Sequence, residues 1–323
     1  MDRLVRIALL VFALVSPSCR CSHKTARLER PEPSVRSLPS GVASAGVPAR
    51  LDAHELTWIY PDTEVGPMQV VVVIPARLDV EQRFPVLVAM HGRGEALKGP
   101  GPGARGWVDD YWLPQALARL HDPPLTRDDF LGMVTGDRLG RLNGDLERHP
   151  FEGLVVVCPY TPDRLSGDLP FESAEPLARF LVDELLPRVR RETPAFADAK
   201  RTGIDGVSLG GRASLLVGLL RPEAFGVVAA LQPAFDLVET EGLAARAARA
   251  LRRNAELRFR LVTSSRDYYL ESTRALAASF RAVGAEPNLL VAVGNHSYDF
   301  NRGPGVYEML LFHDRALRGR DWP

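Results

Sequence analysis

The chain has 323 residues, of which 46% are hydrophobic and 25% are charged, and its basic and acidic side chains balance to a net charge of zero. This is the composition of an ordinary globular protein, and the balance excludes the strong basic bias that nucleic-acid-binding proteins show. The length suits one large α/β domain or two small ones. We expect no metal site, since no spacing of cysteines and histidines resembles one.

Residues 1–18 resemble a secretory signal peptide. A basic start is followed by an apolar run over residues 7–15, which is too short to span a bilayer as a mature helix. A small residue directly before Cys19 is typical of a bacterial lipoprotein processing site, although Ser16 stands where an apolar residue is usual. We therefore expect an exported protein that is anchored to a membrane through a lipid on Cys19. Plain secretion, to the periplasm or beyond, and an uncleaved anchor or a misread start are the alternatives.

Residues 19–50 are rich in Pro, Ser and Arg and have no sustained apolar period, which predicts a flexible linker. A folded domain is expected over residues 51–323. Its first two predicted strands, residues 56–60 and 68–74, are joined by a Pro/Gly loop and favour a hairpin.

Short apolar runs rich in Val, Leu and Ile then alternate with helical patterns. Continuous runs of this kind predict strands that are buried on both faces, as in a parallel sheet covered by helices. The further strands are expected at 86–90, 154–158, 201–207, 227–231, 257–263 and 289–293. The helices are expected at 113–120, 175–191, 212–220, 243–253, 272–283 and 305–317. Pro187 predicts a kink or a break in the second of these helices, and Cys158 is expected to be a buried strand thiol.

A long segment, residues 92–153, separates two of the predicted strands. Connections in compact domains usually have only a few residues, so a segment of this length predicts a separate role. It contains a Gly/Pro repeat at 99–103 and the aromatic residues Trp107 and Tyr111. We expect a lid-like or substrate-binding insertion in which Trp107 and Tyr111 contact the substrate. An inert surface elaboration is the alternative.

Residues 206–210 match the pattern Gly-x-Ser-x-Gly with Ser208 at its centre. A predicted strand precedes the match and a predicted helix follows it, which is the context of a nucleophile elbow. The glycines leave room for a strained turn that holds the Ser208 hydroxyl out over the sheet edge. The alternative is a nucleotide-binding turn, but the third spaced glycine and a P-loop lysine are missing. We predict that Ser208 is a nucleophile.

A serine nucleophile of this kind needs an acid and then a histidine, both later in the chain. Asp267 and His296 each follow a predicted strand, and open α/β sheets place their sites at the carboxyl ends of strands. We predict that His296 takes the proton from Ser208 and that Asp267 orients the imidazole. Asp236 and Asp299 are alternative acids.

Two other features bear on the site. His313, inside the last predicted helix, is expected to be structural. The sequence His91-Gly92-Arg93-Gly94 follows the strand at 86–90, where hydrolases of this architecture carry an oxyanion loop. We predict that the backbone N–H groups of Arg93 and Leu209 form the oxyanion hole and that His91 and Gly92 contact the substrate. The alternative is an ordinary glycine turn with Arg93 facing solvent.

Four segments together resemble the esterase family of the α/β-hydrolase superfamily that includes enterochelin-esterase-like, feruloyl-esterase-like and esterase-D-like enzymes. The segments are residues 88–92, 180–187, 206–211 and 294–300, and the resemblance covers residues 65–318. It implies an α/β-hydrolase fold with a mostly parallel sheet of about eight strands, helices on both faces and a long insertion after the third strand. It also implies that Ser208, Asp267 and His296 form a triad that hydrolyses a small carboxylic ester through an acyl-enzyme, without a cofactor.

The chain departs from that family in the long segment after Gly92 and in the arginine at the oxyanion-loop position, so the acyl and alcohol groups are not predicted. Two other functions stay open. An acyltransferase of the same fold would pass the acyl group to an alcohol other than water. A non-catalytic binding module on a hydrolase scaffold is the second, although a pure binder has no physical need for a complete triad.

Overall fold

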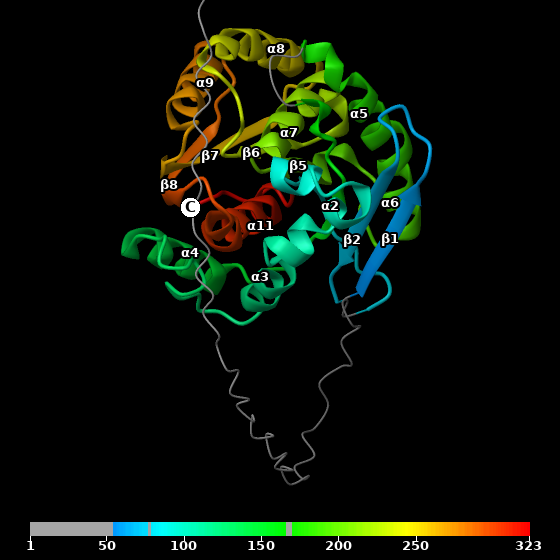
Figure 1. The fold of residues 1–323 in the computed structure, drawn as a ribbon. Coiled ribbons are helices and arrows are strands. Elements are labelled where there is room, and N and C mark those ends of the chain that lie inside the picture. Colours follow the sequence, from blue (N-terminus) through cyan, green and yellow to red (C-terminus); the bar gives the residue numbers. More distant parts are fainter. Residues whose placement is uncertain (1–53, 77–78, 166–169) are drawn as a thin grey trace, which may run out of the picture. The chain divides into compact units, whose positions relative to one another are not determined.

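An eight-stranded sheet lies at the centre of the part of the chain that the computed structural model describes, residues 54–76, 79–165 and 170–323 (Figure 1). The predicted signal peptide, the linker and Cys19 lie outside the described residues. The strands are β1 (His54–Tyr60), β2 (Met68–Ile74), β3 (Val86–Met90), β4 (Val155–Pro159), β5 (Thr202–Gly206), β6 (Val227–Leu231), β7 (Arg258–Arg266) and β8 (Asn288–Asn295). Their order across the sheet is β1-β2-β4-β3-β5-β6-β7-β8.

The sheet is parallel from β4 to β8, and only β1 and β2 run antiparallel to their neighbours. This confirms the mostly parallel sheet of about eight strands, with β1 and β2 paired as the predicted hairpin. Every residue of β3, β4, β5 and β6 is buried. The uninterrupted apolar sequences of β3, β4 and β6 are explained by this burial, because helices cover both faces of the sheet. Cys158 is one of these buried residues.

The helices divide between the two faces of the sheet. They are α1 (Arg93–Ala96), α2 (Pro100–Ala104), α3 (Leu113–Leu120), α4 (Gly136–Arg148), α5 (Glu175–Arg179), α6 (Leu186–Glu192), α7 (Leu209–Leu220), α8 (Thr240–Arg253), α9 (Leu270–Ala282), α10 (Tyr298–Phe300) and α11 (Val306–Ala316). One apolar core joins the sheet to α5 through α9, and a second joins it to α3, α4 and α11. Figure 1 shows α8 and α9 at the top of the view, α3 and α4 at the bottom of the folded part, and α11 between them.

Pro187 does not break its helix. A π-helical turn, Phe180–Leu185, connects α5 to α6, and Pro187 lies in the first turn of α6. Because proline has no N–H to donate to the preceding turn, a locally wider turn accommodates it while the helix continues. Phe180, Leu181 and Leu185 stay buried against the sheet through this turn.

The insertion, residues 92–153, packs as part of the fold. It supplies α1 through α4, and most of its buried apolar side chains belong to the same core as α11. Trp107 and Tyr111 are buried and pack edge to face, with ring centroids 5.0 Å apart. Sequence analysis missed α4, because its apolar residues are only Leu139, Leu142 and Leu146 and because it contains three glycines, which are poor helix formers. A lid role for this segment stays a prediction.

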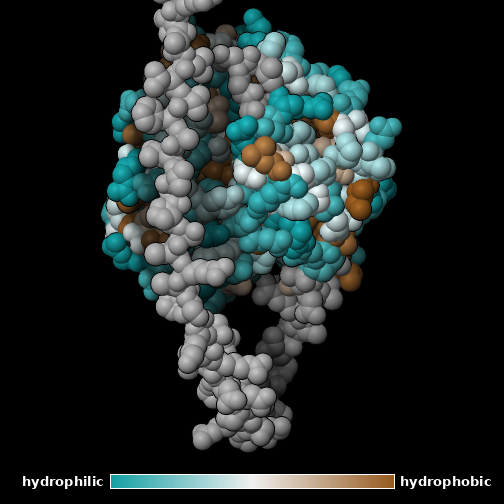
Figure 2. Space-filling model, in the orientation of Figure 1, coloured by the Kyte–Doolittle hydropathy of each residue, from teal (hydrophilic) through white to brown (hydrophobic). Residues whose placement is uncertain are grey.

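The coloured surface in Figure 2 is mainly hydrophilic, and its apolar residues form small separate patches. This is the pattern of a domain whose apolar side chains are gathered inside. No helix in the described ranges combines the length and the apolarity that crossing a membrane requires.

Candidate active site

Ser208 lies in a strained turn between β5 and α7. Its backbone has φ +56° and ψ −115°, a conformation that residues with a Cβ rarely adopt. The turn is held by β6, because Ser208 N–H donates to Leu231 O at 2.9 Å and Ala234 N–H donates to Ser208 O at 3.1 Å. The glycines on either side are required by space, since a Cβ at Gly206 would lie 2.6 Å from the backbone of Gly210. The sequence therefore folds here into the geometry of a nucleophile elbow.

The Ser208 side chain is half-buried beside a cavity of about 180 Å³. The cavity is lined by Arg93, Ser208, Leu209, Arg212, Ala234, Asp236, Glu239 and Tyr269. Two ion pairs border it, Arg212 with Glu239 at 2.7 Å and Arg93 with Asp163 at 2.8 Å. The space next to the serine is thus small, and both charged and apolar side chains line it.

Asp267 and His296 form a direct pair at the ends of β7 and β8. His296 Nδ1 lies 2.8 Å from Asp267 Oδ1, and the Asp267 side chain has no exposed surface. Thr263 Oγ1 donates to the other carboxylate oxygen at 2.7 Å, and Tyr269 N–H donates to Oδ1 at 3.1 Å. Because a carboxylate only accepts hydrogen bonds, the contact assigns the ring proton to Nδ1 and leaves Nε2 as an acceptor.

Two tyrosines hold the His296 ring. Tyr268 stacks on it at 5.1 Å between centroids, and Tyr269 meets it edge to face at 5.6 Å. Tyr269 also lines the cavity beside Ser208. Since β5 through β8 are parallel neighbours, Ser208 and His296 lie at the same edge of the sheet. Among the described residues no hydrogen bond joins the Ser208 hydroxyl to His296. The structure therefore shows a direct contact between Asp267 and His296, and it places Ser208 at the same sheet edge without a direct contact to them.

The alternative residues occupy other places. Asp236 lies after β6 at the start of a 3-10 turn, and Asp299 is exposed and lies 3.6 Å from Arg302. Within the described ranges neither carboxylate contacts His296. His313 is fully buried in α11 with Nε2 3.1 Å from Asp205 Oδ2, and burial lowers its pKa. These positions agree with a structural role for His313 and leave Asp267 as the acid against the imidazole.

Gln232 supports this edge of the sheet and was missed by the sequence analysis. It follows β6 with φ +45° and is fully buried. Its side-chain amide donates to Ser264 Oγ at 2.7 Å and to Asn295 O at 3.0 Å. Asn295 directly precedes His296, so Gln232 ties the end of β6 to the strand that carries the histidine. Its place directly after an apolar strand is the signal that could have identified it.

The backbone N–H groups of Leu209 and Arg93 have no acceptor among the described residues. They open α7 and α1, and both residues line the cavity beside Ser208. N–H groups at helix starts are donors that a negative oxygen can use. The N–H of the preceding residue is not available, because Gly92 N–H donates to the Tyr111 hydroxyl at 3.2 Å. The two predicted donors are therefore among the N–H groups that have no acceptor in the described part of the chain.

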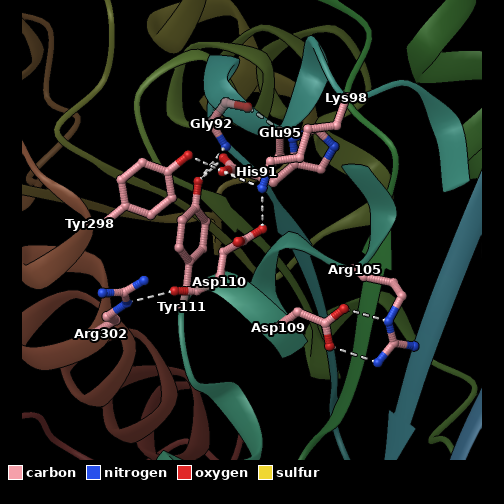
Figure 3. A network of polar contacts seen from close by, with 10 residues as sticks. All are labelled: His91, Gly92, Glu95, Lys98, Arg105, Asp109, Asp110, Tyr111, Tyr298 and Arg302. Carbon is pink, nitrogen blue, oxygen red and sulfur yellow. Dashed lines mark hydrogen bonds and ion pairs between the residues drawn. The ribbon is translucent and has the colours of Figure 1, made fainter. Parts of the chain in front are cut away.

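The loop itself rests on His91, which is buried. Thr161 N–H donates to His91 Nε2 at 2.8 Å, so the proton is on Nδ1, which donates to Gly92 O at 2.9 Å. Burial lowers the pKa of His91 to about 4, which keeps the ring neutral. Three side chains lie behind the loop: His91 and Tyr111, which Figure 3 shows, and Trp107. In the described part of the chain, none of the three lines the cavity beside Ser208. Substrate contact by these residues stays a prediction.

Part of the chain is similar in sequence to known esterases. Residues 170–283 match the family described as "Putative esterase"; the match contains Ser208 and Asp267 and ends before His296. A stretch of 148 residues is 28% identical to an endo-1,4-beta-xylanase/feruloyl esterase of Xylanibacter ruminicola. That alignment covers 45% of this chain but only 16% of the relative's length.

Solved structures share the fold at low sequence identity. A ferulic acid esterase has a TM-score of 0.58 at 14% identity, covering 82% of this chain and 99% of that one. An S-formylglutathione hydrolase of Staphylococcus aureus has 0.55 at 10%, covering 81% and 99%. An enterobactin esterase of Shigella flexneri has 0.54 at 19%, covering 82% and 60%. The described residues form an α/β-hydrolase fold, and residues 170–283 match the model of the family described as "Putative esterase".

Proposed function

We propose that this protein is a serine carboxylic-ester hydrolase in which Ser208, His296 and Asp267 act as a triad. The observation that carries the proposal is the 2.8 Å pair of His296 and Asp267 at the same sheet edge as a serine in a strained elbow. The serine, the acid and the histidine also follow one another in the chain order that this fold requires. The family match and the esterases among the structural neighbours support the same reaction class.

In the proposed reaction Ser208 Oγ attacks the ester carbonyl while its proton passes to His296 Nε2. The Asp267 carboxylate stabilises the imidazolium that forms. The carbonyl oxygen becomes an oxyanion that accepts hydrogen bonds from the N–H groups of Leu209 and Arg93. Collapse of this intermediate breaks the bond to the alcohol, which leaves with the proton from His296. Water then repeats the steps on the acyl-enzyme, releasing the acid and restoring the serine.

The missing bond between Ser208 and His296 is compatible with this route. Catalytic hydrogen bonds are often long or poorly aligned before substrate binds and tighten in the complex. The substrate is proposed only as a small carboxylic ester. The names of the structural neighbours refer to substrates as different as ferulic acid esters, S-formylglutathione and enterobactin, so they favour no particular acyl or alcohol group. An acyltransferase would follow the same steps with an alcohol in place of water.

The test is labelling of the purified protein with a fluorophosphonate, together with hydrolysis of p-nitrophenyl acetate. We expect Ser208→Ala to lose both labelling and turnover, by at least about a thousandfold in kcat, while the unfolding temperature changes little. Ser214→Ala is the matched control, because this buried serine lies in α7, six residues after Ser208, and its hydroxyl donates to Gly210 O at 2.8 Å. It should label like the wild type.

Substantial turnover in Ser208→Ala would contradict the proposal. A folded wild type that neither labels nor turns over would favour the binding module. Products of acyl transfer when an alcohol is added in excess would favour the transferase.

A further inference from the structure

A buried carboxylate stands behind the proposed oxyanion loop. Glu95 lies in α1, two residues after Arg93, and only 1% of it is exposed. The Tyr298 hydroxyl donates to its Oε1 at 2.5 Å, and the Tyr111 hydroxyl donates to its Oε2 (Figure 3). Lys98 Nζ lies 3.7 Å from Oε1 and 2.6 Å from Asp110. A carboxylate without such partners would be too costly to bury, so these contacts are what hold it there.

One arm of the cluster reaches the backbone of the loop. The Tyr111 hydroxyl that donates to Glu95 also accepts from Gly92 N–H at 3.2 Å. Gly92 O accepts from His91 Nδ1 at 2.9 Å and from Ala96 N–H at 3.2 Å. Both polar groups of Gly92 are therefore fixed, and the peptide that carries Arg93 N–H follows directly from it.

The other arm reaches the loop of the proposed base. Tyr298 begins α10, two residues after His296, and it meets Glu95 across 203 positions of sequence. The rings of Tyr298 and Tyr111 also pack at 5.7 Å between centroids. One carboxylate thus joins the loop after β3 to the loop after β8. A shift of Glu95 would move the oxyanion donor and the histidine relative to each other.

Glycines around the cluster make room for it. A Cβ at Gly94 would lie 2.5 Å from the Tyr298 hydroxyl, and a Cβ at Gly106 would lie 2.5 Å from Glu95 Cγ. A Cβ at Gly92 would come within 3.0 Å of the Tyr111 hydroxyl. Burial and the charge of Glu95 raise the pKa of both tyrosines, so both phenols keep the protons that they donate. The backbone and the side chains are thus fitted to one arrangement.

We propose that Glu95, through the hydroxyls of Tyr111 and Tyr298, is a positioning residue that sets the Arg93 N–H against His296 for the reaction. The inference rests on the proposed function. It assigns Glu95 no contact with substrate and no proton to transfer. Its effect should appear in kcat rather than in KM, because misplaced transition-state donors slow the chemical step without weakening ground-state binding.

The test compares two Tyr→Phe variants, each of which removes one tyrosine hydroxyl that donates a hydrogen bond to α1. Tyr298→Phe removes the bond to Glu95, whereas Tyr160→Phe removes a bond of 2.8 Å to Ala96 O in the same helix and leaves the carboxylate alone. We expect Tyr298→Phe to lower kcat for p-nitrophenyl acetate by at least about tenfold with KM changed by less than about threefold. Tyr160→Phe should leave kcat within about twofold.

A double-mutant cycle with Glu95→Gln adds a second readout. If both residues act through one carboxylate, the double variant should lose no more activity than the worse single variant. If Glu95→Gln does not fold, the comparison of Tyr298 with Tyr160 still decides. The inference would be overturned if Tyr298→Phe kept the kcat of the wild type, or if both Tyr→Phe variants lost the same amount of activity. In either case, hydrolysis by the wild-type protein would leave the proposed function standing. A wild type without labelling or hydrolysis would overturn both.

Discussion

At the scale of single residues, the Asp267 carboxylate is the most tightly held part of the site. It accepts from Thr263, from Tyr269 N–H and from His296 Nδ1, and its side chain has no exposed surface. All three partners are donors, so a neutral amide at this position would meet at least one of them with its own N–H groups. The orientation and tautomer of His296 therefore depend on the negative charge of Asp267.

We predict that Asp267→Asn lowers kcat by about a thousandfold or more, because the amide favours the wrong imidazole tautomer. Asp299→Asn is the matched control, since Asp299 is an exposed acid three residues after His296 and lies against Arg302. Steady-state kinetics of the two variants on p-nitrophenyl acetate make the comparison. A larger loss in Asp299→Asn would move the acid to that residue.

A second residue-scale prediction concerns His91 and acid stability. Its folded pKa of about 4 lies below the ordinary value of 6.5, so on acidification the unfolded chain binds a proton that the folded protein refuses. The free energy of unfolding should therefore fall as the pH drops from 6.5 toward 4, by about 3 kcal/mol from this residue. Burial lowers the pKa of His313 in the same direction.

The variant His91→Gln isolates that contribution, since its amide can still donate to Gly92 O and accept from Thr161 N–H. Urea denaturation between pH 4 and pH 7 should give a flatter dependence for the variant than for the wild type, with the slope that remains coming from His313 and the acids. Parallel curves for the two proteins would show that His91 titrates normally.

At the scale of elements, the insertion changes in meaning once its packing is known. The sequence predicted that residues 92–153 form a lid-like or substrate-binding insertion, with an inert surface elaboration as the alternative. In the structure α3 and α4 cover the same sheet face as α11, and Leu113, Leu120, Leu142 and Leu146 are buried there. Burying a side chain of this size contributes about 1.5–3 kcal/mol, so the four together contribute about 6–12 kcal/mol, which is comparable to the whole stability of a typical domain.

We therefore predict that replacing residues 113–148 by a short Gly/Ser loop prevents folding. Circular dichroism and a thermal melt would report this as the loss of a cooperative transition. Removal of residues 1–53 is the comparison and should leave the transition in place. A deletion variant that melts cooperatively and acts on a wider range of esters would instead support the lid.

At the scale of the whole molecule, the sheet and the order of the site residues were predictable and the contacts between distant loops were not. Runs of Val, Leu and Ile reveal buried strands because burial on both faces permits few other residues. The elbow is likewise local, since five consecutive residues specify it. By contrast, the bond between Glu95 and Tyr298 spans 203 positions and joins the loops after β3 and β8, two strands that β5, β6 and β7 separate in the sheet. Gln232 was missed for the same reason, because the residues to which its amide donates lie on β7 and β8 and are known only once the order of the strands is known.

The φ of +56° at Ser208 has a consequence for the evolution of the chain. Glycine would adopt this conformation without steric cost, whereas a serine raises the free energy of the folded state by about 1–3 kcal/mol. Selection for thermal robustness alone would thus act against the residue that the proposed reaction requires. The hydroxyl persists there only as long as activity is under selection, and a lineage released from that demand should drift at this position before its core changes.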